Sequence, residues 1–418
     1  MGRTRVNLQP IGGRFRTGLP ALLLGAALLL TTGCGASGDN GGGGGSGGAD
    51  GKGGAASGRT TGTEASQAMV TVKPDDGSKE VATSGVLKIT STGGKLTTVT
   101  VADTKGNAVE GKLAADGASW EPARNLGSAT EYKVHAVAKD GSGHESAKDT
   151  TFTTLTPTNT FVGHYVPEDG ETVGVGMPVS INFSRGITNP EAVEKAITVT
   201  AVPPVPVEGH WFGNDRLDFR PEKYWAAGTK VTVKLALDGV EGRPGVYGKQ
   251  TRTVSFTVGR SQVTTVDASA HQMQVVRDGQ VLKDVPITAG GPSTTTYNGQ
   301  MVISEKYKVT RMNGATVGFG GEYDISDVPH AMRLSQSGTF VHGNYWASSD
   351  TFGSENVSHG CVGLRDARGA GDDDMPAAWF FNESLIGDVV VVKNSKDKQI
   401  APDNGLNGWN LDWAEWIK

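Results

Sequence analysis

The sequence predicts a chain of mostly β structure. Short runs in which apolar and polar residues alternate recur throughout, they are rich in Val, Thr and Gly, and helix signals are sparse. With 418 residues, the chain has room for two to four domains of ordinary size. The formal net charge of -5 gives no electrostatic reason to expect a nucleic-acid partner.

Residues 1–34 are expected to be an export signal that ends in a lipidated cysteine. Arginines precede an apolar run over residues 19–30, which is too short to span a bilayer and is typical of a secretory signal. The small residues before Cys34 resemble the lipobox of bacterial lipoproteins, in which the cysteine becomes the lipidated first residue. That resemblance implies a lipid anchor at Cys34. Ordinary signal cleavage beside an incidental cysteine is the alternative.

Residues 35–66 are expected to be a flexible tether. They are almost entirely Gly, Ser, Ala, Thr and Asp, with unbroken glycine at 41–45. Such a composition cannot bury enough apolar surface to fold. A Gly-rich coil of this length has an end-to-end distance of roughly 30 Å, which is enough to hold a domain clear of a membrane surface.

Residues 67–157 and 158–259 are two copies of a weak internal repeat. Pro-Asp-Asp-Gly at 74–77 corresponds to Pro-Glu-Asp-Gly at 167–170, and a Trp-Glu-Pro in the first copy corresponds to Phe-Arg-Pro in the second. Each copy contains short alternating strands of the kind that build immunoglobulin-like β-sandwiches. Neither copy has a cluster of acid, base and nucleophile, so both are expected to be spacers or binding modules.

Residues 260–395 are expected to form a third β-rich unit. The Asp-Gly at 278–279 lies between two strand runs and suits a type I′ hairpin turn. The Asn-Gly at 298–299 predicts a second turn. The four consecutive valines at 389–392 predict a buried strand.

One helix is expected in this third unit. Three aspartates at 372–374 can cap its N-terminus, Pro376 fits its first turn, and an apolar face follows before Gly387. Because the carboxylates are adjacent rather than spaced around a cavity, a cap is favoured over a metal site. Residues 396–418 form a tail with three tryptophans, which we expect to pack against a neighbouring domain.

Cys361 is the only cysteine after the lipobox, and we expect it to be a nucleophile. A thiol attacks as the thiolate and needs a base, which His342 can supply from nineteen positions earlier. His359 would point the opposite way in an extended segment and is the poorer base. The backbone amides of Gly360 and Cys361 lie where an oxyanion would form, and Ser358 can hold the turn or the imidazole by hydrogen bonding.

A buried structural cysteine beside satisfied histidines remains open as an alternative. A zinc site would need three or four closely spaced ligands, and redox exchange would need a resolving cysteine; the sequence around Cys361 supplies neither. We therefore expect no metal and no organic cofactor.

The spacing of these residues resembles a known family, the L,D-transpeptidases with a YkuD-type catalytic domain. The family pattern is a histidine followed, after a gap, by Ser/Thr-His-Gly-Cys. Here fifteen residues separate His342 from Ser-His-Gly-Cys at 358–361. Paired immunoglobulin-like domains, a catalytic β-sandwich and a Trp-rich tail are together similar to the lipid-anchored actinobacterial members.

Carried over to this sequence, the resemblance implies that Cys361 is the nucleophile and His342 its base. It implies that the backbone carbonyl of Gly343 orients the imidazole. It further implies that the oxyanion site is shaped by His359, Gly360 and Cys361. Tyr323 lies roughly where related enzymes place a lid tyrosine near the donor peptide.

Two positions depart from the family pattern. Gly363 stands where many relatives have asparagine or arginine, so a side-chain contact to substrate is missing there, with Arg365 as its expected substitute. Gly343 replaces a serine, which is expected to cost little if only the backbone carbonyl is used.

The resemblance implies a peptidoglycan enzyme that forms 3→3 crosslinks through a cysteine thioester. Stem peptides would be donor and acceptor, and carbapenem-type β-lactams would be covalent inhibitors. A lipid on Cys34 would hold the enzyme at the outer face of the cell membrane, reaching into the wall. Two alternatives stay open: an L,D-carboxypeptidase that uses water as acceptor, and a non-catalytic wall-binding lipoprotein, whose expected mark would be a missing base or nucleophile.

Overall fold

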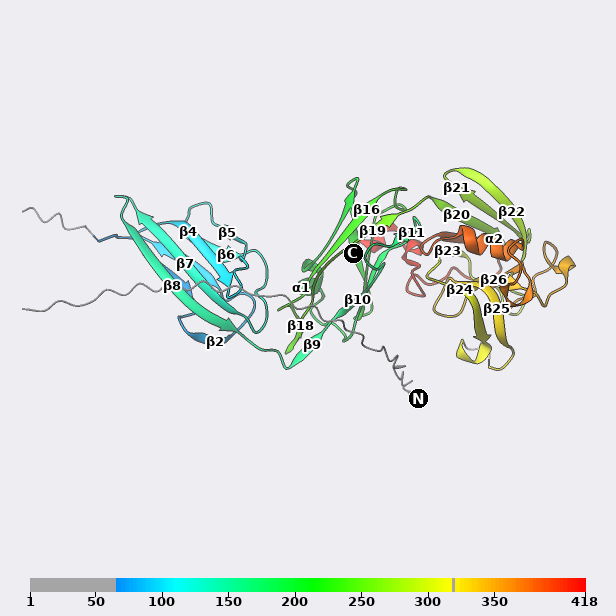
Figure 1. The fold of residues 1–418 in the computed structure, drawn as a ribbon, viewed down its shortest axis with the longest axis horizontal. Coiled ribbons are helices and arrows are strands. Elements are labelled where there is room, and N and C mark those ends of the chain that lie inside the picture. Colours follow the sequence, from blue (N-terminus) through cyan, green and yellow to red (C-terminus); the bar gives the residue numbers. More distant parts are fainter. Residues whose placement is uncertain (1–64, 318–319) are drawn as a thin grey trace, which may run out of the picture. The chain divides into compact units, whose positions relative to one another are not determined.

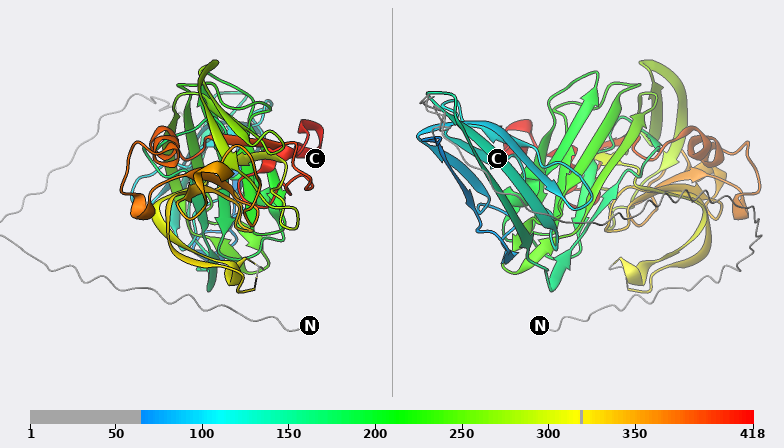
Figure 2. Two further views of the ribbon diagram at one scale, coloured as in Figure 1. Left: turned by 90° about the vertical axis from the view of Figure 1, so that its right-hand side faces the viewer. Right: turned by 60° about the vertical axis from the view of Figure 1, so that its left-hand side comes forward.

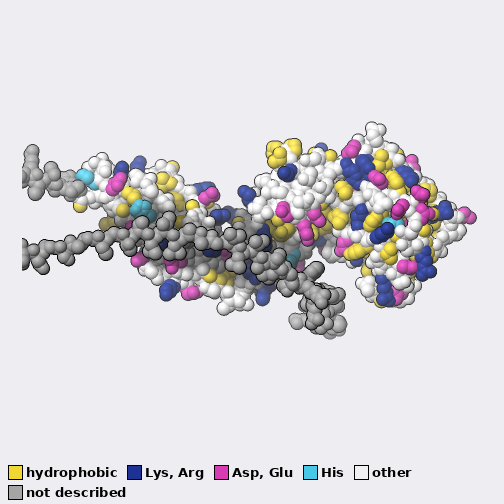
Figure 3. All heavy atoms as spheres, in the orientation of Figure 1, with side chains coloured by type: hydrophobic (Ala, Val, Ile, Leu, Met, Phe, Trp, Pro, Cys, Tyr) yellow, Lys and Arg dark blue, Asp and Glu magenta, His cyan; other side chains and the backbone are white. Residues whose placement is uncertain are grey.

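The computed structural model describes residues 65–317 and 320–418 (Figure 1). The predicted export signal, Cys34 and nearly all of the tether lie outside the described residues. The described part is mostly β with a few short helices, as predicted. None of its helices has the length and apolar character needed to cross a membrane. On the face shown in Figure 3, basic and acidic side chains are interspersed.

Two four-stranded sheets enclose the core of the first immunoglobulin-like unit, which includes Ile89, Trp120 and Phe152. Buried and exposed residues alternate along its strands, as the alternation in the sequence predicts. One sheet has the order β1 (Met69–Lys73), β3 (Lys88–Thr92), β6 (Ser119–Pro122) and β5 (Gly111–Leu113). The other has the order β2 (Ser78–Val81), β8 (Glu145–Thr154), β7 (Glu131–Asp140) and β4 (Gly94–Asp103).

The second unit has two similar sheets and an additional small one. The first has the order β10 (Gly163–Val166), β12 (Val179–Phe183), β15 (Arg216–Arg220) and β14 (Glu208–Phe212). The second has the order β11 (Thr172–Val173), β19 (Thr251–Val258), β16 (Lys230–Ala236) and β13 (Ile197–Val202). The small sheet contains β17 (Glu241–Arg243), β18 (Val246–Gly248) and β9 (Asn159–Phe161). Helix α1 (Pro190–Lys195) was not predicted, since six residues are too few for a recognisable helical period.

The Pro-Asp-Asp-Gly and Pro-Glu-Asp-Gly segments of the two repeat copies make equivalent hydrogen bonds. In the first copy, Asp76 accepts a hydrogen bond from the backbone N–H of Thr151 at 2.7 Å. In the second, Asp169 accepts one from the backbone N–H of Ser255 at 2.8 Å. Each aspartate therefore ties the start of its unit to the last long strand of the same unit.

The third unit is built on one nine-stranded sheet. Its order is β23 (Gly299–Val302), β28 (Val389–Lys393), β20 (Gln262–Asp267), β21 (Gln272–Arg277), β22 (Gln280–Thr288), β27 (Val362–Arg365), β26 (Phe340–Asn344), β25 (Asp324–Arg333) and β24 (Glu305–Asn313). The long β24–β25 hairpin, yellow in Figure 2, is strongly curved. Short 3₁₀ turns occur at η1 (Gly314–Thr316), η2 (Ser349–Thr351) and η3 (Arg368–Ala370). β26, which carries His342, pairs in parallel with β27, which begins directly after Cys361. This pairing brings the two residues into the same region of the sheet.

One predicted turn in this unit is confirmed and the other is wrong. Asp278 and Gly279 both have positive φ, 49° and 80°, as a type I′ turn requires. The Asn-Gly at 298–299 does not reverse the chain, because Gly299 begins β23. Asn298 instead uses its side-chain amide to donate to two backbone carbonyls of the segment that follows β28, at 3.0 and 2.6 Å.

Helix α2 (Pro376–Glu383) starts at the predicted proline, but the aspartates do not cap it. The capping position is Met375, and no side chain there accepts a hydrogen bond from the helix. Asp372 accepts a hydrogen bond from the backbone N–H of Asp374 at 3.0 Å, so its carboxylate forms a local turn before the helix. The C-terminal carbonyls are satisfied by Lys306, whose ammonium donates to Phe381 O at 2.6 Å.

The tail packs against the second immunoglobulin-like unit, as predicted. It contains η4 (Gly408–Asn410) and α3 (Trp413–Trp416). The guanidinium of Arg220 lies 4.7 Å from the ring of Trp409 and 4.2 Å from that of Trp416. Arg220 also donates to the backbone carbonyl of Leu411 at 3.0 Å. The arginine of the Phe-Arg-Pro repeat element therefore anchors the tail.

Candidate active site

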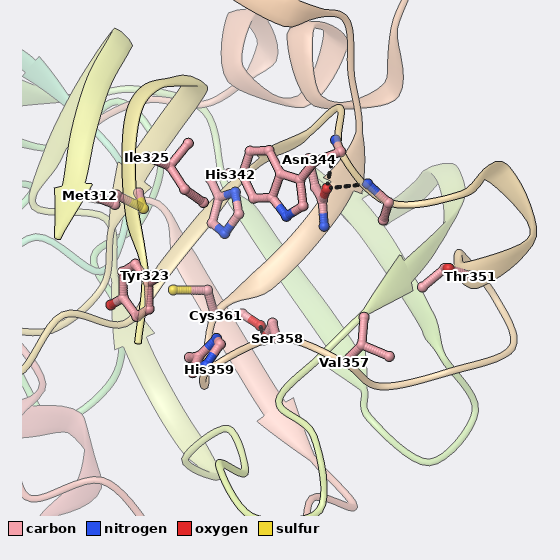
Figure 4. Close-up of a pocket in the computed structure, with 12 residues that line it drawn as sticks. Met312, Tyr323, Ile325, His342, Asn344, Thr351, Val357, Ser358, His359 and Cys361 are labelled. Atoms are coloured by element: carbon pink, nitrogen blue, oxygen red, sulfur yellow. Dashed lines mark hydrogen bonds between the residues drawn. The ribbon is translucent and has the colours of Figure 1, made fainter. Parts of the chain in front are cut away.

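A cavity of about 330 Å³ opens beside Cys361 in the third unit (Figure 4). The far end of the β24–β25 hairpin, the end of β26 and the loop before Cys361 form its walls. Apolar side chains dominate the lining. The lining residues are Met312, Tyr323, Ile325, His342, Asn344, Trp346, Ala347, Thr351, Val357, Ser358, His359 and Cys361.

Ser358 folds the turn that presents Cys361. Its hydroxyl donates to the backbone carbonyl of Cys361 at 2.6 Å and accepts the N–H of Gly360 at 3.2 Å. Gly360 has a φ of 109°, which favours glycine. The backbone N–H of Ser358 donates to Ala289 O at 3.0 Å, which fixes the turn to the end of β22. Local hydrogen bonding thus sets the position of the thiol.

His342 lies on β26 with its imidazole held in one tautomer. Its Nδ1 is 2.8 Å from the backbone carbonyl of Gly343. A carbonyl can only accept, so the neutral ring carries its proton on Nδ1 and exposes a lone pair on Nε2. Trp346 stacks on the ring at a centroid distance of 5.7 Å. Burial lowers the pKa of His342, and the bond to Gly343 opposes this shift. A neutral base at neutral pH follows.

Cys361 is a buried thiol that is 8 % exposed and lies in a small apolar cluster with Val328, Ala331 and Phe340. Burial raises its pKa to about 11. The Sγ–H donates to the backbone carbonyl of Gly338 at 3.6 Å. Within residues 65–317 and 320–418, no hydrogen bond joins Cys361 to His342. The resting thiol is therefore neutral, and its proton is directed at Gly338 O rather than at His342.

Tyr323 and His359 form the wall of the pocket next to the hairpin end. Their ring centroids are 5.0 Å apart, and His359 Nε2 lies 3.2 Å from Glu322 Oε2. Burial, followed by the charges of Cys361 and Glu322, raises the pKa of Tyr323 to about 12. The phenol therefore keeps its proton at neutral pH.

A buried pair that the sequence did not suggest lies behind His342. Asp366 Oδ2 is 2.7 Å from His330 Nδ1, and both side chains are buried. A Cβ added at Gly343 would lie 1.9 Å from this carboxylate oxygen. The glycine is therefore required by packing in this chain. The expectation that glycine in place of serine costs little stays a prediction, and His342 uses only the backbone carbonyl at this position.

Arg365 does not reach the pocket. It is exposed near the end of β27 and is absent from the cavity wall, so the structure does not support it as a substitute for a side chain at 363. Gly363 itself is buried on the same strand. The polar group nearest to its missing Cβ is the Asn344 amide, whose Nδ2 would be 3.5 Å away.

Sequence reasoning missed most of the apolar wall and two polar residues, Asn344 and Asp366. Met312, Ile325 and Val357 reach the pocket through strand pairing and loop folding, which are not visible in a motif. Asn344 carried a usable signal, because it lies two positions after His342 in an extended segment and must face the same side.

Comparisons with known proteins show which proteins this chain is similar to. A family model described as a bacterial Ig domain matches residues 78–241, and one described as an L,D-transpeptidase catalytic domain matches residues 261–392. L,D-transpeptidase 2 of Mycobacterium tuberculosis is 32 % identical over 418 residues, covering 99 % of this chain and 96 % of the relative. L,D-transpeptidase 5 of the same species is 30 % identical over 357 residues, covering 83 % and 76 %. A solved structure of the L,D-transpeptidase LdtMt1 in complex with imipenem is 29 % identical and covers 57 % of this chain and 100 % of that chain, with a TM-score of 0.47.

Proposed function

Because this chain belongs to the L,D-transpeptidase family, we propose that it forms 3→3 crosslinks between peptidoglycan stem peptides through a thioester on Cys361. The observation that carries the proposal is the arrangement of a single buried thiol and a neutral histidine base in one pocket. In such a pair, the base activates the nucleophile by accepting the proton of the thiol.

In the first step, Cys361 leaves the Gly338 carbonyl and passes its proton to His342 Nε2. The thiolate attacks the carbonyl carbon of the diamino acid at the third position of a tetrapeptide stem. As the tetrahedral intermediate collapses, the C–N bond to the terminal D-alanine breaks and the imidazolium returns the proton to the leaving amine. The products are free D-alanine and a thioester on Cys361.

In the second step, a side-chain amine of another stem attacks the thioester carbonyl. His342 takes the proton that the amine loses, the C–S bond breaks, and the sulfur recovers a proton from the imidazolium. The acceptor then carries a new amide bond. If water attacks instead, the same steps give the carboxypeptidase product.

We place the oxyanion donor at the backbone N–H of Cys361 rather than at that of Gly360. The Gly360 N–H is occupied by Ser358 Oγ at 3.2 Å. Tyr323 lines the hairpin side of the pocket, where its ring would contact the donor stem.

The test is the mass of the muropeptide products made by the purified protein. We expect 3→3 linked dimers and D-alanine with the wild type, and neither with Cys361→Ala or His342→Gln. His164→Gln changes an exposed histidine of the second unit and should leave the products unchanged. Dimers formed at the wild-type rate by Cys361→Ala would exclude the mechanism, and tripeptide without dimer would favour the carboxypeptidase.

The same thiolate is proposed to open carbapenem-type β-lactams. Attack on the lactam carbonyl forms a thioester and transfers a proton to the ring nitrogen, so the protein should gain the full mass of the inhibitor. The adduct should map to Cys361 in a proteolytic digest, and an unchanged mass after prolonged incubation would refute this.

We also propose that Cys34 carries the lipid and holds the enzyme at the outer face of the cell membrane, on the basis of the lipobox-like sequence. Cys34→Ala should move the protein from the membrane fraction to the soluble fraction. Retention of this variant in the membrane fraction would remove the anchor assignment.

A further inference from the structure

Asn344 is a buried amide in the wall of the pocket that the mechanism above does not use. It is 5 % exposed and lies on β26, two residues beyond His342. Its Oδ1 accepts the backbone N–H groups of Trp346 at 3.2 Å and Ala347 at 3.0 Å. Because that oxygen is committed to the loop, the orientation of the amide is fixed and Nδ2 presents two N–H donors on the other side.

These two donors have no acceptor in the described part of the chain, and they point away from the loop toward the cavity (Figure 4). Among the described residues, Nδ2 is not one of the fully enclosed side-chain atoms left without a hydrogen-bond partner, so its two donors can be reached from the cavity. Most of the cavity wall is apolar, with few fixed donors. In such a pocket, a small number of placed polar groups determines how a ligand is oriented.

Gly363 packs closely beside this amide. A Cβ at 363 would lie 2.8 Å from Thr288 Cγ2 and 3.5 Å from Asn344 Nδ2. A longer side chain would therefore compete with any group that bound the amide. Glycine at 363 therefore places no side chain from β27 against the donors of Asn344.

We propose that Asn344 is a substrate-binding residue whose Nδ2–H groups donate to a carbonyl or carboxylate oxygen of a stem peptide bound across Cys361. This inference rests on the proposed function and adds a specificity contact to it. A neutral amide suits an acyl oxygen, which accepts without requiring a full positive charge. The oxygen belongs either to the donor stem or to the acceptor stem, and the two sources have different kinetic consequences.

The alternative is that Asn344 serves only as a cap for the loop that follows it. Asn344→Asp separates the two roles, since an aspartate keeps an oxygen for the N–H groups of Trp346 and Ala347 but has no N–H to donate. Asn344→Ala removes both functions. A structural role predicts that the aspartate variant resembles the wild type, whereas a donor role predicts that both variants are impaired.

The experiment measures D-alanine release and dimer formation by the purified protein with a tetrapeptide donor and a second stem as acceptor. Loss of one or two hydrogen bonds should lower kcat/KM by roughly tenfold in both variants. A fall in D-alanine release assigns the oxygen to the donor. A normal release with a lower ratio of dimer to hydrolysed product assigns it to the acceptor.

A binding measurement keeps this test independent of the chemistry. In a Cys361→Ala background, Asn344→Asp should weaken tetrapeptide or acceptor binding by roughly tenfold, as seen by calorimetry. Alkylation of Cys361 by iodoacetamide in the single Asn344 variants checks that the thiol environment is intact. Wild-type binding and turnover in Asn344→Asp would overturn the proposal. Failure of the wild type to turn over stems would instead refute the proposed function, while an effect of Asn344→Asp on peptide binding would still stand.

Discussion

Gly343→Ala tests whether packing of a buried carboxylate fixes the backbone next to the catalytic base. The added Cβ would lie 1.9 Å from Asp366 Oδ2 and 2.6 Å from Asp366 Cβ. The carboxylate cannot swing away freely, since Oδ2 is bonded to His330 at 2.7 Å and Oδ1 accepts the N–H of Ala367 at 2.7 Å. Gly343 does not have a left-handed φ, so the collision alone is responsible for any effect.

We expect this substitution to lower the free energy of unfolding by about 1–3 kcal/mol from overpacking. If the Asp366–His330 hydrogen bond breaks as well, leaving buried polar atoms unpaired adds a further ~1–3 kcal/mol. The melting temperature should fall by several degrees. Because Gly343 O orients His342, the rate of acylation by a β-lactam should also fall.

Thermal unfolding of the full-length protein and the rate of adduct formation are the two readouts. Gly141→Ala is the control, since no atom lies within 4 Å of the Cβ position there, and it should change stability by less than about 0.5 kcal/mol. Asp366→Gly removes the colliding side chain, so Gly343→Ala should cost little in that background. Equal melting temperatures and acylation rates for Gly343→Ala, Gly141→Ala and the wild type would show that the packing argument is wrong.

Three further predictions follow from the described contacts. Because burial raises the pKa of Cys361 to about 11, its thiolate forms only at high pH. The rate of alkylation by iodoacetamide should therefore still increase with pH at about pH 10. A rate that levels off near pH ~8.5, the pKa of a free cysteine, would contradict this. Asp388→Ala removes the buried partner of Arg260, which lies 2.9 Å away, and should lower the free energy of unfolding in urea by about 3–5 kcal/mol. Asp374→Ala changes an exposed carboxylate and should lower it by almost nothing. Similar values for the two variants would refute this prediction. Trp416→Ala should destabilise the protein by about 3–5 kcal/mol, well beyond the half-buried Trp413→Ala, and equal losses would argue against tail burial as the cause.

Much of the fold followed from local patterns. Alternation along β7 predicted a strand with one buried face, and the Asp-Gly at 278–279 predicted a type I′ turn, because both depend on neighbouring residues only. The turn predicted from Asn-Gly at 298–299 was wrong because neighbouring residues alone do not determine the conformation there. Its conformation is set by a segment about a hundred residues later that supplies the acceptors for Asn298.

The candidate site divides in the same way. Cys361 and His342 could be predicted because the chemistry needs a thiol and a base, and because the spacing between His342 and the Ser-His-Gly-Cys motif resembles that of a known family. The Asp366–His330 pair was not predicted, because the two residues are 36 positions apart in the sequence and meet only through the packing of the folded sheet. The capping role assigned to the aspartates before α2 was wrong because capping depends on backbone geometry at Met375, which composition does not reveal.

The hydrogen bond between Cys361 and the Gly338 carbonyl also bears on how long the thiol survives in an oxidising medium. Peroxides and disulfides react with thiolates, and their rates follow thiolate fraction and exposure. At neutral pH, a thiol with a pKa of about 11 is ionised to only about 1 part in 10,000, compared with roughly 3 % for an ordinary cysteine. The low thiolate fraction should therefore slow the oxidation of Cys361. The same low degree of ionisation leaves the thiol dependent on His342 for its activation, so resistance to oxidants and the need for a base have one cause, the burial of Cys361.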